Sequence, residues 1–287
     1  MKVSGFTFVR NGTTFDYPFI ESLQSLLPLC DEVIVAVGKS DDDTLERIQS
    51  LHSKKIKILQ TTWDESLRKN GAILAQQTNI ALQHVTGDWA IYLQADEVFH
   101  EKDYSTIRHA MNVYLPQHEV EGMLFRYNHF YGSYQYIGDS RKWYRREIRI
   151  IRPNIGIQSW GDAQGFRLNG QKVHVKLIDA CVYHYGWVKP PAIQQLKQQY
   201  FNKLWHPDDW MKTHIADTME YDYRNGGKLK IFSDTHPAVM HDRVANQYWK
   251  FEYSPAKIQR SLKEQLLNAI EKKTGWRVGE YRNYKMI

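Results

Sequence analysis

The chain has 287 residues, of which 42% are hydrophobic and 24% are charged, a balance typical of a folded globular protein. No run approaches the roughly 20 apolar residues of a membrane span, and the N-terminus lacks a signal-peptide pattern. The net charge of +6 favours anionic partners such as nucleotides, phospholipid surfaces or nucleic acid. The two cysteines, Cys30 and Cys181, lie in apolar surroundings typical of buried thiols, which argues against a disulfide framework. We therefore expect a cytoplasmic protein without an integral membrane segment, and peripheral contact with a membrane remains open.

The first hundred residues alternate between strand and helix patterns. Apolar runs predict four strands, at residues 2–9, 33–37, 56–59 and 89–93. Helical spacing of apolar residues predicts three helices between them, at residues 17–29, 45–51 and 72–84. This alternation predicts βαβ units and a mostly parallel central sheet flanked by helices, so the fold class is α/β. Neither a Gly-X-Gly-X-X-Gly motif nor a P-loop is present, which disfavours dinucleotide binding and P-loop phosphate chemistry.

The pattern changes after residue 102. Helices are expected at residues 104–115, 192–204 and 255–273, and strands at 122–127 and 147–151, with a strand pair within 173–185. The stretch from 205 to 253 is rich in loops. Because no repeat or linker is visible, we expect one domain over residues 1–287, with a nucleotide-binding half at 1–102 and a mixed second half at 103–287 that ends in helices.

The segment from Gly87 to Val98 holds the first candidate for chemistry. Its apolar strand runs directly into the adjacent carboxylates Asp96 and Glu97. Ligands of open α/β sheets bind outside the carboxyl ends of the strands, and Mg²⁺ typically takes one or two carboxylates plus phosphate oxygens. The alternative is a strand followed by an ordinary acidic turn.

The order of these motifs resembles the family 2 glycosyltransferases, which have a GT-A fold. After the second strand, Ser40, Asp42 or Asp43, and Thr44 match the tail of the family's Asp-Asp-Gly-Ser-X-Asp-X-Thr motif. Asn79 matches the asparagine of the family's later Ala-Arg-Asn helix. The family's metal motif, Asp-X-Asp followed by another acid, aligns with residues 94–97. The resemblance covers about the first hundred residues.

The chain departs from the family pattern at four positions. Val37 and Gly38 stand where the family has its paired nucleotide-binding acids, and Thr78 replaces the arginine before Asn79. Gln94 replaces the first aspartate of the metal motif. These departures leave the nucleotide base and the metal dependence open.

The resemblance implies transfer of a sugar from a nucleotide-sugar donor to an acceptor, usually with inversion and a divalent cation, Mn²⁺ or Mg²⁺. The candidate donor-binding residues are Arg10, Gly38, Asp42, Arg68, Lys69, Asn79 and Asp96. Arg10, Arg68 and Lys69 follow the first and third strands, where a diphosphate is expected, but each is equally compatible with a solvent-exposed charge.

The same resemblance places a metal-binding histidine and a catalytic base in the second half. The metal candidates are Asp96, Glu97 and His184, with His174, His206 and His214 as alternatives to the histidine. A histidine in an aromatic strand is also compatible with simple core packing.

Asp162, with glycines on both sides in Gly161-Asp162-Ala163-Gln164-Gly165, is the candidate general base that takes the proton of the acceptor hydroxyl. A turn-capping role is the alternative for this residue, and Asp139 and Asp179 are its rivals.

Aromatic residues of the second half are candidates for the acceptor side, because aromatic faces pack against sugar rings. Tyr131, Trp143 and Trp187 are the residues expected to contact an acceptor, although core packing explains them equally well.

Four functions remain open at this stage. The first is an inverting glycosyltransferase that acts on a cell-envelope glycan or another saccharide. The second is a glycosyltransferase that acts on hydroxymethylated DNA, for which the basic cluster from Arg141 to Arg149 would bind phosphates. The third is an inactive nucleotide-sugar or carbohydrate-binding module, motivated by Gly38 and Gln94. A nucleotidyltransferase ranks last, because no glycine-rich triphosphate loop follows the first strand.

Overall fold

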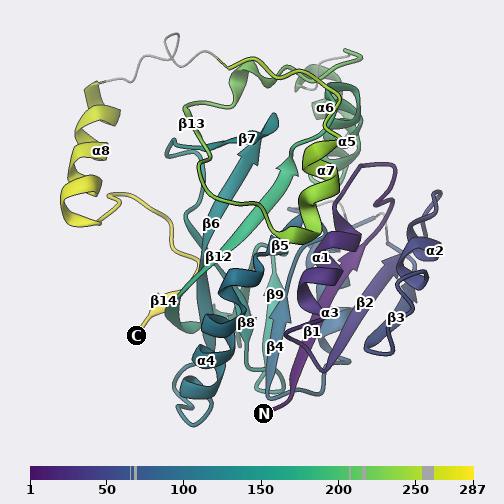
Figure 1. Cartoon of the computed structure of the whole chain (residues 1–287), viewed down its shortest axis with the longest axis vertical. Coiled ribbons are helices and arrows are strands. Elements are labelled where there is room, and N and C mark those ends of the chain that lie inside the picture. The colour runs from purple at the N-terminus through teal and green to yellow at the C-terminus, as the bar shows by residue number, and fades with distance from the viewer. Residues whose placement is uncertain (65, 68–69, 207, 215–217, 254–261) are drawn as a thin grey trace.

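The computed structural model describes residues 1–64, 66–67, 70–206, 208–214, 218–253 and 262–287 (Figure 1). Within these residues a large sheet has the strand order β13-β7-β6-β8-β4-β1-β2-β3, and β12, β5 and β14 attach beside this path. A separate three-stranded sheet has the order β11-β10-β9. Helices cover both faces of the large sheet, as the α/β prediction requires.

The first half forms the predicted parallel sheet. Its strands are β1 (Val3–Val9), β2 (Glu32–Gly38), β3 (Ile56–Thr61) and β4 (Trp89–Tyr92). Its helices are α1 (Phe19–Leu26), α2 (Thr44–Gln49) and α3 (Ala72–Leu82). All three strand pairs, β3 with β2, β2 with β1 and β1 with β4, are parallel. The predicted alternation of strands and helices is confirmed.

Strand β2 shows why its run is continuously apolar. Val33, Val35 and Val37 face the cluster that contains α1 and α4 (Tyr104–Tyr114). Ile34 and Ala36 face the opposite cluster, which contains α3 and the small sheet. Because successive side chains of a strand point to opposite faces, a strand covered on both sides must be apolar at every position.

The second half extends the sheet with mixed pairing. Its strands are β5 (Glu97–Phe99), β6 (Gly122–Tyr131), β7 (Ser133–Gly138), β8 (Arg146–Ile151), β12 (His174–Trp187), β13 (Leu229–Ile231) and β14 (Lys285–Met286). β8 is antiparallel to β4 and to β6, whereas β12 runs parallel to β6 along most of its length. The mixed character expected of this half is confirmed.

The strand pair predicted within residues 173–185 is wrong, because this segment is the single 14-residue strand β12. The pairing register between β12 and β6 shifts between Leu177 and Cys181, so the irregularity is a bulge in one strand. Asp179, which lies in this interval, is exposed and pairs with Arg126. A polar residue inside an apolar run therefore marks a bulge here, where the sequence pattern suggested a turn.

The remaining elements surround the sheet. The small sheet contains β9 (Ile157–Trp160), β10 (Gly165–Leu168) and β11 (Gln171–Lys172). The later helices are α5 (Pro191–Lys203), α6 (Asp208–His214), α7 (His241–Ala245) and α8 (Leu262–Thr274), and short 3₁₀ turns occupy Glu101–Asp103, Tyr223–Asn225 and Ala238–Met240. The final helix was expected from residue 255, and residues 255–261 lie outside the described part of the chain.

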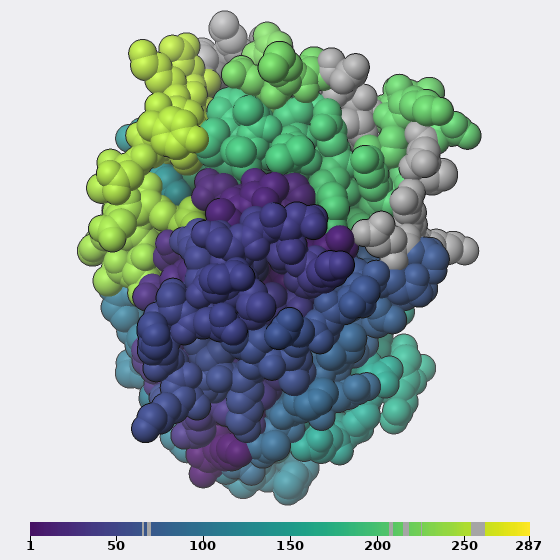
Figure 2. All heavy atoms as spheres, turned by 90° about the vertical axis from the view of Figure 1, so that its right-hand side faces the viewer, coloured from purple at the N-terminus to yellow at the C-terminus, as the bar shows by residue number. Residues whose placement is uncertain are grey.

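The face at the β3 edge is formed mainly by the first half of the chain, coloured purple to blue in Figure 2, and later segments border it above. In the described residues no helix is both long and apolar enough to cross a bilayer. Cys30 is buried and Cys181 is half-buried, and both are free thiols.

One buried ion pair connects the two halves behind the carboxyl end of β4. The guanidinium of Arg149, on β8, donates two hydrogen bonds of 2.7 Å to the carboxylate of Glu97, and both side chains are fully buried. The same guanidinium donates to the carbonyl of Gln164 at 3.0 Å. The backbone N–H of Gln94 and the hydroxyl of Tyr127 also donate to Glu97, at 3.1 and 2.8 Å. The pair therefore joins the loop after β4 to the turn before β10.

Because removing one partner leaves a buried charge without compensation, Glu97→Gln and Arg149→Met should each lower the free energy of unfolding by about 3–5 kcal/mol. The combined variant Glu97→Leu/Arg149→Met should cost less than the sum of the single changes, since it leaves no unpaired charge. Urea denaturation followed by circular dichroism measures both effects. A loss below about 1 kcal/mol for Glu97→Gln would contradict the structural role of the pair.

Candidate functional site

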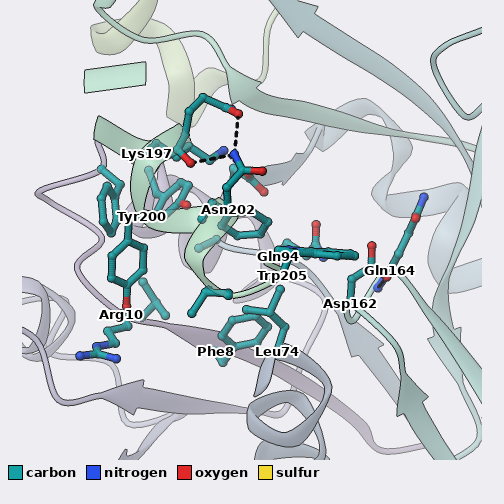
Figure 3. Close-up of a pocket in the computed structure, with 18 of the residues that line it drawn as sticks. Phe8, Arg10, Leu74, Gln94, Asp162, Gln164, Lys197, Tyr200, Asn202 and Trp205 are labelled. Atoms are coloured by element: carbon teal, nitrogen blue, oxygen red, sulfur yellow. Dashed lines mark hydrogen bonds and ion pairs between the residues drawn. The ribbon is translucent and has the colours of Figure 1, made fainter. Parts of the chain in front are cut away.

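A cavity of about 400 Å³ lies at the carboxyl ends of β1 and β4, and α5 forms its opposite wall. Figure 3 shows Arg10 near one end of this cavity and Asp162 with Gln164 at the other, with Gln94 and Trp205 between them. The main contributions come from the end of β1, the loop after β4, the β9–β10 turn, the end of β12 and the region of α5. We call this space the main cavity. It lies where ligands bind in open α/β sheets.

Asp96 is the principal charged group of the main cavity. Its Oδ2 lies 3.7 Å from Nε2 of His184 and 3.6 Å from Nζ of Lys197. Burial opposes ionisation of this carboxyl, but His184 and the ammonium groups of Lys197 and Lys189 hold the pKa of Asp96 well below its usual range. Asp96 is therefore an anion held among cationic and imidazole groups, and it is available to bind a cation.

The orientation of the His184 ring is set by a second histidine. Nε2 of His129 lies 2.8 Å from the carbonyl oxygen of Tyr144, so this nitrogen carries a proton. Burial, followed by the proximity of His184, lowers the pKa of His129 well below its usual range, so the ring is neutral and its Nδ1 is an acceptor. Nδ1 of His184 lies 3.0 Å from that acceptor and must be the donor. This assignment from the hydrogen-bond network leaves Nε2 of His184 facing Asp96, 3.7 Å away, where a proton or a cation can lie between the two atoms.

Asp96 and His184 together fit one side of a divalent cation site. A carboxylate oxygen and an imidazole lone pair that face each other repel unless a cation or a proton lies between them. In the described residues no three His, Cys, Asp or Glu side chains are grouped as ligands, so the protein offers two groups here. Mg²⁺ commonly completes its coordination with substrate phosphates and water, and Mn²⁺ accepts the same oxygen ligands.

Asp162 lies at the other end of the main cavity, in the turn between β9 and β10. The turn is tight, because Gly161 and Ala163 on either side both have positive φ angles, of 64° and 62°. Burial raises the pKa of the Asp162 carboxyl above its ordinary value. One oxygen accepts a hydrogen bond of 3.3 Å from the backbone N–H of Gln164, two residues later. Asp162 thus caps its own turn and still faces the cavity.

The sequence profile of the family described as Glycosyl transferase family 2 matches residues 17–178, more than half of the chain. The chain belongs to glycosyltransferase family 2. A search of curated protein sequences finds no match to it.

This family 2 chain is also similar to several solved structures. S. aureus TarS is 16% identical, with a TM-score of 0.42 over 70% of this chain and 39% of that one. TarS 1–349 in complex with UDP-GlcNAc is 21% identical, with a TM-score of 0.33 over 45% and 35%. Glucosyl-3-phosphoglycerate synthase from Mycobacterium tuberculosis, in complex with Mn²⁺, UDP and phosphoglyceric acid, is 19% identical, with a TM-score of 0.29 over 45% and 43%. The family 2 chain thus spans less than half the length of these proteins.

The expected metal role of Glu97 does not fit the geometry. Both of its carboxylate oxygens accept hydrogen bonds from Arg149, and the side chain has no exposed surface. Glu97 is absent from the lining of the main cavity, whereas its neighbour Asp96 is part of it. In this family 2 chain Glu97 has a structural role: its ion pair with Arg149 holds the loop that carries Asp96.

The donor-side candidates have different positions. Arg10 lines the main cavity, with its guanidinium 5.3 Å from the ring centre of Trp63. Gly38 and Asp42 line a second, adjacent cavity of about 380 Å³ at the ends of β2 and β3. Asp42 accepts hydrogen bonds from the backbone N–H groups of Thr14, at 2.7 Å, and Thr44, at 3.0 Å. Although partial burial opposes it, these bonds lower the pKa of Asp42.

Asn79 does not reach the main cavity. Its side chain both donates to and accepts from the backbone of Ser159, at 3.2 and 2.7 Å, which ties α3 to β9. The expected donor contact by Asn79 is therefore replaced by a structural one. Arg68 and Lys69 lie outside the described residues.

Of the three acceptor candidates in the described structure, Trp187 alone lines the main cavity. Tyr131 is 2% exposed and packs against both tryptophans, with ring centres 5.7 Å from Trp143 and 5.8 Å from Trp187. Tyr131 is therefore a core residue that supports Trp187. Trp143 lines a different cavity, which also has Tyr144 in its wall.

The rivals to the predicted residues lie elsewhere, with one exception. Asp139 pairs with Lys228 at 3.3 Å, and Asp179 pairs with Arg126 on the surface. His174 faces Glu121. His206 does line the main cavity, where its ring stacks on Trp210 with 3.6 Å between ring centres. His214 stacks on the same tryptophan.

Several buried charged residues in or near the main cavity could not be predicted from the sequence. Lys197 projects from α5 to Asp96, and Lys189 is fully buried nearby, where burial and the charge of Lys197 lower its pKa to about 7. Glu147 lies close to the turn of Asp162, accepting a hydrogen bond of 3.1 Å from the Gln164 side chain, and burial raises its pKa to about 8. No local pattern distinguishes these residues from surface charges, because their burial arises from packing between distant segments.

Gly38 illustrates how this chain departs from the family motif. A Cβ atom at position 38 would lie 2.4 Å from the indole Nε1 of Trp63 and 3.0 Å from Cβ of Arg10. The Trp63 ring therefore fills the space that the Cβ atom of any other residue at position 38 would need. Trp63 Nε1 is buried without a hydrogen-bond partner among the described residues, and the ring lines the main cavity.

Gly38→Ala should displace Trp63 and lower the free energy of unfolding by about 1–3 kcal/mol, the usual cost of overpacking a tight contact. Combining Gly38→Ala with Trp63→Leu should cost less than the sum of the single changes, because the smaller side chain relieves the clash. Thermal unfolding of the four proteins of this cycle measures the coupling. Strict additivity would show that the two residues do not contact each other.

Proposed function

We propose that this chain is an inverting glycosyltransferase that moves a sugar from a nucleotide-sugar to a hydroxyl of a saccharide acceptor. The observation that carries the proposal is that Asp96, His184 and Asp162 line one cavity at the carboxyl ends of β1 and β4. This cavity has cation-binding and cationic groups on one side and an isolated carboxylate on the other. Leaving-group stabilisation and base catalysis require these two kinds of group. Residues 1–102 form the nucleotide-sugar-binding half, and residues 103–287 supply the acceptor side together with His184 and Lys197 for the diphosphate.

The donor nucleotide occupies the side of the main cavity near Arg10 and Trp63. Arg10 supplies a guanidinium at the end of β1, and the indole ring supplies a flat apolar surface beside it. Guanidinium groups bind phosphates, and aromatic faces pack on bases and sugars. The diphosphate then extends toward Asp96, His184 and Lys197.

Departure of the nucleoside diphosphate is helped by positive charge in the main cavity. Lys197 lines this space, and Lys189 is buried close to Lys197 and Asp96. Asp96 and His184 would hold a divalent cation, Mn²⁺ or Mg²⁺, which when bound neutralises charge that develops on the diphosphate. Such preorganised charge in a site that excludes water accounts for much of the catalysis in group transfer.

Asp162 acts as the general base. Its carboxylate takes the proton of the acceptor hydroxyl as the hydroxyl oxygen forms a bond to the anomeric carbon. The bond from that carbon to the diphosphate oxygen breaks at the same time, and its electron pair leaves with the nucleotide. Attack from the face opposite the leaving group inverts the configuration of the sugar.

A saccharide acceptor is favoured over modified DNA by the state of the basic cluster at 141–149. Arg149 is fully buried against Glu97, and Arg141 and Arg145 are bound to glutamates of the C-terminal region. These arginines therefore do not form an open row for a phosphate backbone. An inactive binding module is disfavoured because Asp162 remains in the cavity with its pKa raised by burial, a state suited to proton transfer.

Asp162→Asn should lower kcat by about 100- to 10,000-fold, the usual contribution of a general base, while donor affinity stays unchanged. Nucleoside diphosphate release from a nucleotide-sugar measures the rate, and titration calorimetry measures the affinity. Asp88→Asn is the matched control, because Asp88 is exposed just before β4 and lines neither the main cavity nor the cavity that contains Trp143. Retention of more than a tenth of the wild-type rate by Asp162→Asn would remove the residue from the mechanism.

The pH profile follows from the raised pKa of Asp162. The base is active only when ionised, so the rate should fall as the pH decreases through this pKa. Because burial raises it, the midpoint should lie above the 3.8 of an ordinary aspartate. This acid limb should disappear from the residual activity of Asp162→Asn, and an unchanged limb would assign it to another group.

His129→Phe should weaken Mn²⁺ binding by about 10- to 100-fold, because it removes the acceptor that orients the His184 ring. His236→Phe is the control, since His236 is also partly buried and bonded to Tyr134 and Tyr185 but lies outside the main cavity. Electron paramagnetic resonance titration of Mn²⁺ measures both variants. Equal affinities in the wild type and His129→Phe would show that the histidine chain does not serve a metal.

A further inference from the structure

A cavity of about 500 Å³ lies in the acceptor half, next to the main cavity. We call it the basic cavity. Tyr144 lines both cavities, and His129, which lines the basic cavity, is hydrogen-bonded to His184 of the main cavity at 3.0 Å. Among the described residues that line it, seven are Arg or Lys and two are Asp or Glu. This charge imbalance indicates an anionic ligand.

Part of the positive charge is neutralised within the protein. The carboxylate of Glu271, on α8, lies between Arg141, Arg145 and Arg277, at 2.8, 3.0 and 3.5 Å. One carboxylate thus serves three guanidinium groups, and Glu280 adds a second partner for Arg145 at 2.8 Å. Arg126 pairs with Asp179, and Lys228 pairs with Asp139. These contacts explain how α8, which buries none of its own described residues, is attached to the rest of the chain.

Other donors of the basic cavity have no such partner. Arg146 contacts the sulfur of Met286 at 3.9 Å, and neither Arg146 nor Lys272 pairs with a carboxylate among the described residues. Attachment of α8 accounts for neither of these two cations. They therefore remain for an anionic ligand.

A phosphate group meets this requirement. It carries negative charge and several acceptor oxygens, and guanidinium groups bind it with charge-assisted hydrogen bonds. A volume of about 500 Å³ is within the range of small-molecule sites and exceeds what a bare phosphate needs. The donor diphosphate is directed to the main cavity, so the second phosphate site belongs to the other substrate.

We infer that the basic cavity binds a phosphate group of the acceptor, so that the acceptor is a phosphorylated saccharide or polyol. This inference rests on the proposed function and specifies its substrate class. The phosphate lies against Arg146 and Lys272, and the sugar or polyol extends past Tyr144 toward Asp162. Trp143, which sequence analysis placed on the acceptor side, lines the same cavity.

The test compares glucose 1-phosphate and glycerol 1-phosphate with glucose and glycerol, by titration calorimetry on the full chain. The variant is Arg146→Gln/Lys272→Gln, which leaves the Glu271 contacts intact. The control is Lys54→Gln/Lys273→Gln, which removes the same charge from two exposed positions that do not line the basic cavity. Thermal unfolding confirms that both variants are folded.

The phosphorylated compounds should bind the wild type at least tenfold more tightly than their neutral counterparts. The Arg146→Gln/Lys272→Gln variant should lose at least tenfold of this affinity, since each charge-assisted hydrogen bond contributes about this factor. The control should bind like the wild type. Equal binding by variant and wild type, or no binding of either phosphorylated compound, would overturn the inference.

Two further binding experiments test whether the phosphate that binds belongs to a lipid or to a nucleic acid. Vesicles of phosphatidylglycerol in phosphatidylcholine present a lipid phosphate, and a 20-base-pair duplex presents a nucleic-acid backbone. Binding of vesicles or duplex that is lost in Arg146→Gln/Lys272→Gln, without binding of the small phosphates, would overturn the phosphorylated-saccharide assignment.

A nucleotide-sugar titration separates failure of this inference from failure of the proposed function. The variant should bind a nucleotide-sugar as the wild type does, because neither substituted residue lines the main cavity. If no nucleotide-sugar binds the wild type, the proposed function fails, and the phosphate titrations still report on the basic cavity. If donors bind and phosphate affinity is independent of Arg146 and Lys272, only the inference fails.

Discussion

The buried ion pair between Arg149 and Glu97 is the constraint on which the site depends. It holds the loop after β4 through Glu97 and the turn before β10 through the carbonyl of Gln164. These two segments carry Asp96 and Asp162, which lie 66 positions apart in the sequence and line one cavity. Buried charges are costly unless they are fully paired, so this arrangement tolerates little variation. The relative position of the cation-binding side and the base is thereby set by one guanidinium.

The parts of the fold and of the site that could be predicted from the sequence are those with a recognisable pattern of neighbouring residues. Residues 33–37 are apolar at every position because each face of β2 meets a different core, and this pattern is visible without a structure. Asp96 could be found because it follows a buried strand at its carboxyl end, where ligands of open α/β sheets bind. Asp162 and His184 were located by their place in the second half and by adjacent glycines, and both line the main cavity.

The parts that could not be predicted from the sequence depend on contacts between distant segments. Glu97 and Asp96 are indistinguishable as neighbours in sequence, and only the position of Arg149, 52 residues later, makes Glu97 structural. Lys197 reads as an ordinary charge on a polar helix, yet the packing of α5 places it 3.6 Å from Asp96. The bulge in β12 resembled a turn because an exposed aspartate interrupts an apolar run in both cases. In each case the role of the residue follows from its position relative to other segments and not from its type.

The most direct test of the account is a panel of nucleotide-sugars incubated with the purified chain in Mn²⁺, in Mg²⁺ and in chelator. Thermal stabilisation reports binding to the native state, and nucleoside diphosphate release reports turnover. The account predicts that one donor stabilises the protein in the presence of a divalent cation and is slowly hydrolysed, and that the chelator abolishes both effects. Absence of stabilisation by every donor in all three conditions would contradict the assignment of the main cavity to a nucleotide-sugar.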